Sequence, residues 1–215
     1  MKATSVLSAL LFAAWAPIAA ADVIFTVGNN PQPDENNILF SAGDTGTLIT
    51  GEVDHSGVAV EFSSLTGQTL YQNAQGQASI TEVNGDPLTS MFVEVPGYTF
   101  GDFILNLQNG TGTATVVAVD NFNETFMYSL GNGQNYLTIT TANNESIASV
   151  SVTMSAGGGF DVFKQPRISQ VCNTATSVCI PSPDTGVPEP GILSLVALGL
   201  AAIGVGTVRR KRSFG

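Results

Sequence analysis

The feature that most constrains the fold of this chain is a series of short segments with alternating polarity, separated by turn-forming residues. Val58, Val60 and Phe62 alternate with small or polar residues, and the same pattern returns at 148–154. Alternation with a period of two gives a β-strand one apolar face, whereas an amphipathic helix requires a period of about 3.6 residues. Between residues 22 and 171 no stretch has the helical period. The pattern therefore predicts an all-β domain.

Strand candidates and turns follow one another along the whole of this domain. The predicted strands are 23–27, 48–53, 58–63, 78–83, 100–107, 113–119, 124–130, 136–141 and 148–154. The groups between them, such as Asn-Gly-Asp-Pro at 84–87 and Gly-Asn-Gly at 131–133, begin turns or tolerate a positive φ angle. Because no crossover helices separate the strands, we expect an antiparallel two-sheet β-sandwich of the jelly-roll type.

The first 21 residues have the three parts of a secretory signal peptide. Lys2 precedes an apolar stretch over 6–16, which leads into a run of alanines. The stretch is shorter than the roughly 20 apolar residues that a membrane-spanning helix needs. Ala19 and Ala21 occupy the small-residue positions of an A-x-A cleavage site. We therefore expect the mature chain to begin at Asp22.

The C-terminus carries a short motif, an uncharged run and a basic cluster, in that order. The motif is Val187-Pro188-Glu189-Pro190, the run is 191–208, and the basic residues are Arg209, Arg210, Lys211 and Arg212. As a helix, the run would be about 27 Å long, which is close to the thickness of a hydrocarbon core. Basic residues favour the cytoplasmic side of a membrane, so the preceding chain is expected on the opposite side.

These C-terminal residues resemble the sorting signal of bacterial PEP-CTERM proteins, and the resemblance covers the segment 187–215. It implies that an exosortase, a membrane-embedded cysteine enzyme, recognises the Pro-Glu-Pro element and processes the tail. The implied partners are the exosortase, the export machinery and the membrane, through 191–208. The segment 121–171 also looks like the β-sandwich region often found upstream of this signal. An ordinary single-span tail anchor is the alternative.

Charge is distributed unevenly between the two signals and the domain. Of the 7 basic residues only Lys164 and Arg167 lie in 22–186, together with 16 of the 17 acidic residues, so this part has a net charge of −14. Nucleic-acid binding requires a basic surface, and this composition excludes it. The balance favours solubility and repulsion from acidic polymers.

The sequence predicts four parts and one cross-link. The parts are a signal peptide (1–21), a β-sandwich domain (22–171), a tether rich in Cys, Pro, Ser and Thr (172–186) and the sorting signal (187–215). Cys172 and Cys179 lie in the tether, and in an exported protein we expect them to form a disulfide, with free thiols as the alternative. Two thiolates without further His or Cys ligands do not complete a tetrahedral metal site.

Candidate catalytic residues are few. His55, the only histidine, follows Asp54, and no Gly-x-Ser-x-Gly motif supplies a nucleophile for it. Glu52 and Asp54 resemble part of the carboxylate pattern of jelly-roll glycosidases, but that pattern continues with a second Glu where this chain has Gly57. We therefore predict a protein that is not an enzyme, with no catalytic residues and no cofactor.

Oxygen-rich segments at 34–37 and 120–124, with Asp161 as a distant contributor, leave calcium binding open, but neither matches an Asp-x-Asp-x-Asp-Gly loop. No metal ligand is therefore predicted.

Two functions from different classes remain. The first is a non-enzymatic protein, sorted by an exosortase to the cell surface or extracellular matrix and linked to exopolysaccharide or biofilm. The alternative is a carbohydrate-binding or carbohydrate-acting extracellular module. The distinguishing feature would be exposed aromatic side chains clustered beside acids and amides on one sandwich face. The tyrosines to examine are Tyr71, Tyr98, Tyr128 and Tyr136.

Overall fold

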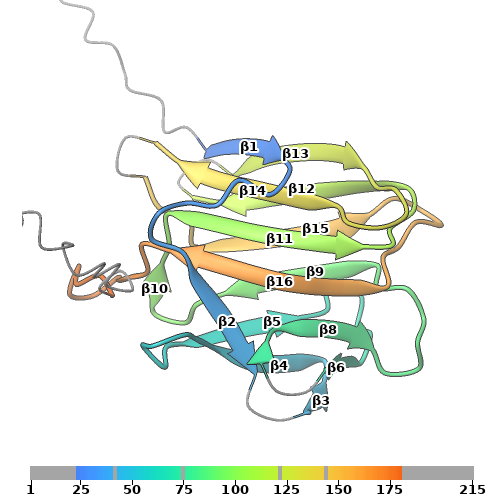
Figure 1. The fold of residues 1–215 in the computed structure, drawn as a ribbon, viewed down its shortest axis with the longest axis horizontal. Coiled ribbons are helices and arrows are strands. Elements are labelled where there is room, and N and C mark those ends of the chain that lie inside the picture. The colour runs from blue at the N-terminus through green and yellow to red at the C-terminus, as the bar shows by residue number, and fades with distance from the viewer. Residues whose placement is uncertain (1–22, 41–42, 74–75, 121–122, 143–144, 181–215) are drawn as a thin grey trace, which may run out of the picture. The chain divides into compact units, whose positions relative to one another are not determined.

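A computed structural model describes residues 23–40, 43–73, 76–120, 123–142 and 145–180, and these residues form an all-β domain (Figure 1). The longer strands are β1 (Val23–Val27), β2 (Asn36–Phe40), β4 (Leu48–Val53), β5 (Ala59–Ser63), β8 (Ser79–Glu82), β9 (Ser90–Glu94), β11 (Asp102–Gln108), β12 (Thr113–Val119), β13 (Glu124–Ser129), β14 (Tyr136–Thr141), β15 (Ser149–Met154) and β16 (Val162–Ser169). The short ones are β3 (Thr45–Gly46), β6 (Leu70–Gln72), β7 (Gly76–Gln77), β10 (Tyr98–Thr99) and β17 (Cys172–Asn173).

The strands form two antiparallel layers that pack face to face (Figure 1). The front layer has the order β1-β14-β11-β16-β8-β6-β3, and the back layer has the order β4-β5-β9-β15-β12-β13. Strand β2 pairs with β16 in the front layer through Asn36 and Asn37, and with β4 in the back layer through Ile38 and Leu39. The two layers are therefore continuous along one side.

From β8 onward the chain passes repeatedly between the two layers. Strands β8, β11, β14 and β16 lie in the front layer in the order β8-β16-β11-β14, and β9, β12, β13 and β15 lie in the back layer in the order β9-β15-β12-β13. Only the hairpin β12–β13 stays within one layer. This is the strand order of a jelly roll, which is the type of sandwich expected from the sequence.

One apolar core lies between the layers, and the alternation of the strands supplies it. On β12, Ala114, Val116 and Ala118 are buried in this core, while the residues between them are partly exposed. Phe62 contacts both Phe40 and Phe163 edge to face, with ring centroids 5.8 and 5.9 Å apart. Loss of one such buried ring typically costs about 3–5 kcal/mol of stability, so these contacts hold the two layers together.

On the side opposite β2, no backbone pairing among the described strands joins the two layers. There β1 and β13 are the end strands of the path. Phe25 of β1 stacks on Phe126 of β13, with centroids 5.3 Å apart and ring planes 7° apart. An aromatic contact thus bridges this side of the sandwich.

The outer side of the front layer is partly covered by the chain between β1 and β2. The Thr138 hydroxyl donates to the Gly28 carbonyl (2.9 Å) and accepts from the Asn30 amide (3.1 Å). The Arg167 guanidinium lies 2.8 Å from the Glu35 carboxylate. This cover explains why Ile104 has no exposed surface although it lies outside the core cluster.

The domain extends further than the sequence predicts. We expected a tether from residue 172, but the folded unit continues to Ile180. Cys172–Asn173 form β17, which pairs with β10, and the Ile180 side chain packs against the core. Composition alone cannot reveal this, because a polar segment becomes ordered when the domain satisfies its backbone hydrogen bonds. The described domain therefore includes residues 172–180, which the sequence analysis assigned to the tether.

The signal peptide, the sorting motif and the run 191–208 lie outside the described residues. Within the ranges that the structure describes, no helix has the length and apolar character needed to cross a bilayer.

Candidate functional site

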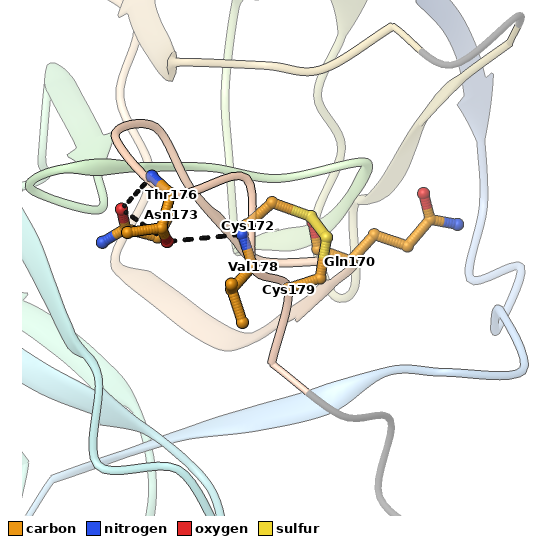
Figure 2. The surroundings of a disulfide bond; sticks show 6 residues. All are labelled: Gln170, Cys172, Asn173, Thr176, Val178 and Cys179. Carbon is orange, nitrogen blue, oxygen red and sulfur yellow. Dashed lines mark hydrogen bonds between the residues drawn. A yellow bond between two sulfur atoms is a disulfide. The ribbon is translucent and has the colours of Figure 1, made fainter.

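The C-terminal end of the described domain is a small cross-linked loop. Cys172 and Cys179 form a disulfide, shown in Figure 2. Strand β17 is held to β10 through the pairs Thr99–Cys172 and Tyr98–Asn173. The Ile180 amide then donates to the Val171 carbonyl over 2.7 Å. The chain therefore leaves the domain from an anchored position.

The Asn173 side chain organises the turn inside this loop. Its carboxamide oxygen accepts hydrogen bonds from the Thr176 amide at 3.0 Å and from the Thr176 hydroxyl at 3.2 Å (Figure 2). It also accepts from the Ala175 amide at 3.0 Å. Ser177 adopts a positive φ of 55° as the chain turns back. For a closed loop this short, a disulfide adds about 2 kcal/mol in the chain-entropy model. Local hydrogen bonds and the cross-link thus stabilise the same loop.

A pocket of about 520 Å³ lies beside the disulfide. Hydroxyl and amide side chains such as Thr99, Ser146 and Gln170 line it, together with the carboxylate of Glu145. Gln170 has a positive φ of 49°, and its side chain lies against Gly101, where any Cβ atom would collide with it. The pocket can form hydrogen bonds to a small polar molecule.

The four tyrosines named in the sequence analysis separate into different environments. Tyr71 on β6 and Tyr136 on β14 are half-buried and point to the outer side of the front layer, since their neighbours Leu70 and Leu137 lie in the core. Tyr98 packs against the core from β10. Tyr128 is buried, and the burial raises the pKa of its hydroxyl. Only two of the four are therefore available on one face.

Glu52, one of the two acidic residues considered for catalysis, lies on the outer side of the back layer with two further glutamates. Glu52 on β4 is exposed there, and Glu61 on β5 stands directly opposite Glu94 on β9. His55 is 74% exposed in its side chain and lies 3.5 Å from Asp54. These groups face solvent, and His55 lies in a turn with a positive φ of 64°.

The two oxygen-rich segments serve local structure. Glu35 accepts from the Gln32 amide at 2.8 Å in addition to its contact with Arg167. Asp120 accepts from the Asn123 amide at 3.0 Å, which closes a turn. Among the residues that the structure describes, no group of three His, Cys, Asp or Glu side chains could hold a metal ion.

Some surface residues that matter for the front layer were not singled out from the sequence. Lys164 and Gln165 lie on β16, which was not predicted as a strand. Charge is the sequence feature that could have drawn attention to this strand, because Lys164 and Arg167 are the two basic residues between the N-terminal and C-terminal export signals.

The residues of the two export signals lie outside the described part of the chain. This holds for Ala19, Ala21 and Asp22, for the motif 187–190 and for the basic cluster 209–212.

Comparisons with known proteins give only distant likenesses. No family model and no curated protein matches the chain. A solved carbohydrate-binding module of family 29 is 11% identical, with a TM-score of 0.24, and the match covers 69% of this chain and 89% of that chain. A mutant of CBM29-2 in complex with mannohexaose is 10% identical, with a TM-score of 0.23, and covers 69% and 92%. At these values the likeness supports no conclusion about the function of this chain.

Proposed function

We propose that this chain is an exported bacterial surface protein whose β-sandwich is displayed by a C-terminal Pro-Glu-Pro sorting signal. The domain acts by binding, without catalysis, and its partner is a surface or matrix polysaccharide. The signal peptide directs export, the segment 191–208 holds the protein transiently in the membrane, and an exosortase processes the tail.

The disulfide between Cys172 and Cys179 is the observation that supports this proposal most strongly. Disulfides persist in oxidising compartments outside the cytoplasm. This one lies where the folded domain ends, and only the six residues 181–186 separate Ile180 from the motif at Val187. The cross-link therefore stabilises the end of the domain through which the protein would be attached to its sorting signal.

The polysaccharide partner is supported by the chemistry of the domain surface. The net charge of −14 over 22–186 disfavours nucleic acids and anionic lipids. Neutral hydroxyl and amide groups, which are suited to hydrogen bonds with sugars, line the pocket beside the disulfide and the outer side of the front layer.

Fractionation of the producing cells, with intact-mass analysis of the protein from envelope and medium, tests the sorting. We expect a species that begins at Asp22 and lacks the tail beyond the motif. Replacing Pro188, Glu189 and Pro190 by Ala should retain the protein at the inner membrane without unfolding the domain. Delivery of that variant to the surface at the normal level would overturn the proposal.

A further inference from the structure

We propose that the outer side of the front layer binds a neutral polysaccharide chain along a row of side chains that crosses five strands. We name this row the glycan row, and it consists of Gln134, Tyr136, Lys164, Gln165, Ser79 and Tyr71. This inference rests on the proposed function, because it names the surface and the ligand class for polysaccharide contact.

The registers of the front layer bring half of the row together. Asn106 on β11 stands opposite Tyr136 on β14 and opposite Lys164 on β16. Lys164 in turn stands opposite Ser79 on β8. Asn106 and Ser79 are flanked on both sides by core residues. Leu137 next to Tyr136 and Phe163 next to Lys164 also lie in the core, so these side chains point outward.

Tyr71 places a second aromatic ring at the other end of the row. It stands opposite Thr81, which shares the outer side of β8 with Ser79. From β14 to β6 there are four strand spacings, a span of about 19 Å and roughly the length of four pyranose rings. A tyrosine therefore marks each end of a strip long enough for a tetrasaccharide.

A β-bulge adds a polar side chain to the middle of this strip. The register between β11 and β16 shifts between Ile104 and Asn106, and Gln165 takes a positive φ of 53° there. The Tyr136 hydroxyl donates to the Gln165 carboxamide oxygen over 2.6 Å. These residues lie on strands separated by β11, so the tyrosine side chain must extend along the sheet. Bulges re-aim side chains in this way beside functional sites.

Gln134 is fixed in place although it is exposed. The amide of Asn106, which has no exposed surface, donates to the Gln134 carboxamide oxygen. The Asn106 oxygen accepts from the Asn135 amide at 2.9 Å. The buried asparagine is thus satisfied. Within the described residues the Gln134 NH₂ group has no protein acceptor, so it can donate to a ligand. Preorganised donors of this kind reduce the entropy lost on binding.

Charge selects a neutral ligand for this surface. The row contains no carboxylate, and Lys164 forms no ion pair within the part of the chain that the structure describes. Its ammonium group can donate to sugar hydroxyls. One lysine does not offset a net charge of −14 over 22–186, so acidic polysaccharides are repelled.

Isothermal titration calorimetry of the full-length chain with neutral polysaccharides tests the proposal. The probes are glucomannan, galactomannan, xyloglucan and their oligosaccharides of two to six sugars, with alginate as the acidic comparison. We expect binding of a neutral probe that strengthens up to about four sugars and changes little with salt. Alginate should not bind. Absence of binding by every neutral probe, or salt-sensitive binding of alginate alone, would overturn the inference.

Matched variants locate the binding. Tyr71→Ala and Lys164→Gln should each weaken binding by roughly tenfold, as expected for loss of one aromatic or charged contact. The control is Phe92→Ala, which removes a half-buried aromatic ring from the outer side of the back layer. It should leave binding unchanged, with circular dichroism confirming the fold of all three variants. Weakening by Phe92→Ala but not by Tyr71→Ala would place the site elsewhere.

The outcome is separable from that of the sorting experiment. Glycan binding by the glycan row would stand even if the protein were delivered without its Pro-Glu-Pro element. Conversely, normal sorting with no glycan binding would leave a surface protein and reject this site.

Discussion

The two outer sides of the sandwich are built by the same strand alternation but differ in charge and in cover. The front side carries Lys164 and Arg167 among tyrosines and amides, and the segment before β2 packs onto it. The back side carries Glu52, Glu61 and Glu94 and faces solvent. A sheet face that is covered in part by its own chain can fix polar side chains in position. On the front side the covering segment holds Thr138 and Arg167 in position.

Breaking the ion pair on the front side should have the largest effect. Arg167→Ala leaves the Glu35 carboxylate, which is 7% exposed, without its cation. Loss of one partner of a buried pair costs about 3 kcal/mol or more, and urea unfolding of the variant should show this loss. The double variant Glu35→Leu/Arg167→Leu should recover most of it. Glu94→Ala on the back side is the control, with an expected change within about 0.5 kcal/mol. An equal loss in both variants would contradict the contrast between the sides.

Two tyrosines allow a hydroxyl group on the front side to be compared with one buried in the core. Tyr136→Phe removes the bond to Gln165 and should destabilise the protein by about 1 kcal/mol. Tyr128→Phe should be neutral or stabilising, because the Tyr128 hydroxyl is buried and has no hydrogen-bond partner among the residues that the structure describes. Thermal unfolding of both variants measures the difference. A larger loss for Tyr128→Phe would show that its hydroxyl has a partner in solution.

The front side should also carry a pH dependence through Glu35. Desolvation by burial, opposed by the Gln32 amide and Arg167, raises the pKa of this carboxyl above its ordinary value of 4.5. The folded state then holds the proton more tightly than the unfolded state, so the contribution of Glu35 to stability is largest below that value. It declines as pH rises through the raised pKa. Relative to wild type, Glu35→Gln should gain stability over this interval in urea titrations at several pH values. If the stability of Glu35→Gln relative to wild type stayed constant or fell as the pH rises, the raised pKa of Glu35 would be refuted.

The smallest effect is expected on the back side. Glu61 and Glu94 stand directly opposite each other, and like charges in such positions are destabilising. Glu61→Gln should therefore stabilise the protein by about 0.3 kcal/mol, and added salt should reduce the gain. Chemical unfolding at two salt concentrations measures it. If the gain in stability did not depend on salt, its cause would not be the repulsion between Glu61 and Glu94.

Much of the fold was predictable because alternation is a local property. The strands at 23–27, 48–53, 113–119 and 136–141 have the predicted bounds. Strand β16 was missed because Pro166 interrupts its pattern, and the bulge at Gln165 accommodates that proline. Strand β2 was missed because its first residues, Asn36 and Asn37, belong to a segment that was considered a calcium loop. The two-residue strands exist only through pairing partners far away in sequence.

The candidate surfaces were less accessible to sequence reasoning. Tyr71 and Tyr136 could be named as exposed aromatics, but their common face depends on a strand order that alternation does not encode. Lys164 was visible only as one of few basic residues. The cysteine pair was identified from its spacing, whereas its contact with β10 follows from the tertiary fold.

The position of β16 has a mechanical consequence for a protein held by its C-terminal end. Strand β16 is an inner strand, flanked by β11 on one side and by β8 and β2 on the other, whereas β1 is an end strand. Tension applied at Ile180 passes through the disulfide, bypasses the loop 173–178, and loads β16 along its axis. The hydrogen bonds on both sides of β16 are perpendicular to this force. They are therefore loaded in shear at the same time. Tension applied at β1 would meet bonds on one side only, so the C-terminal end is the stronger point of attachment under flow.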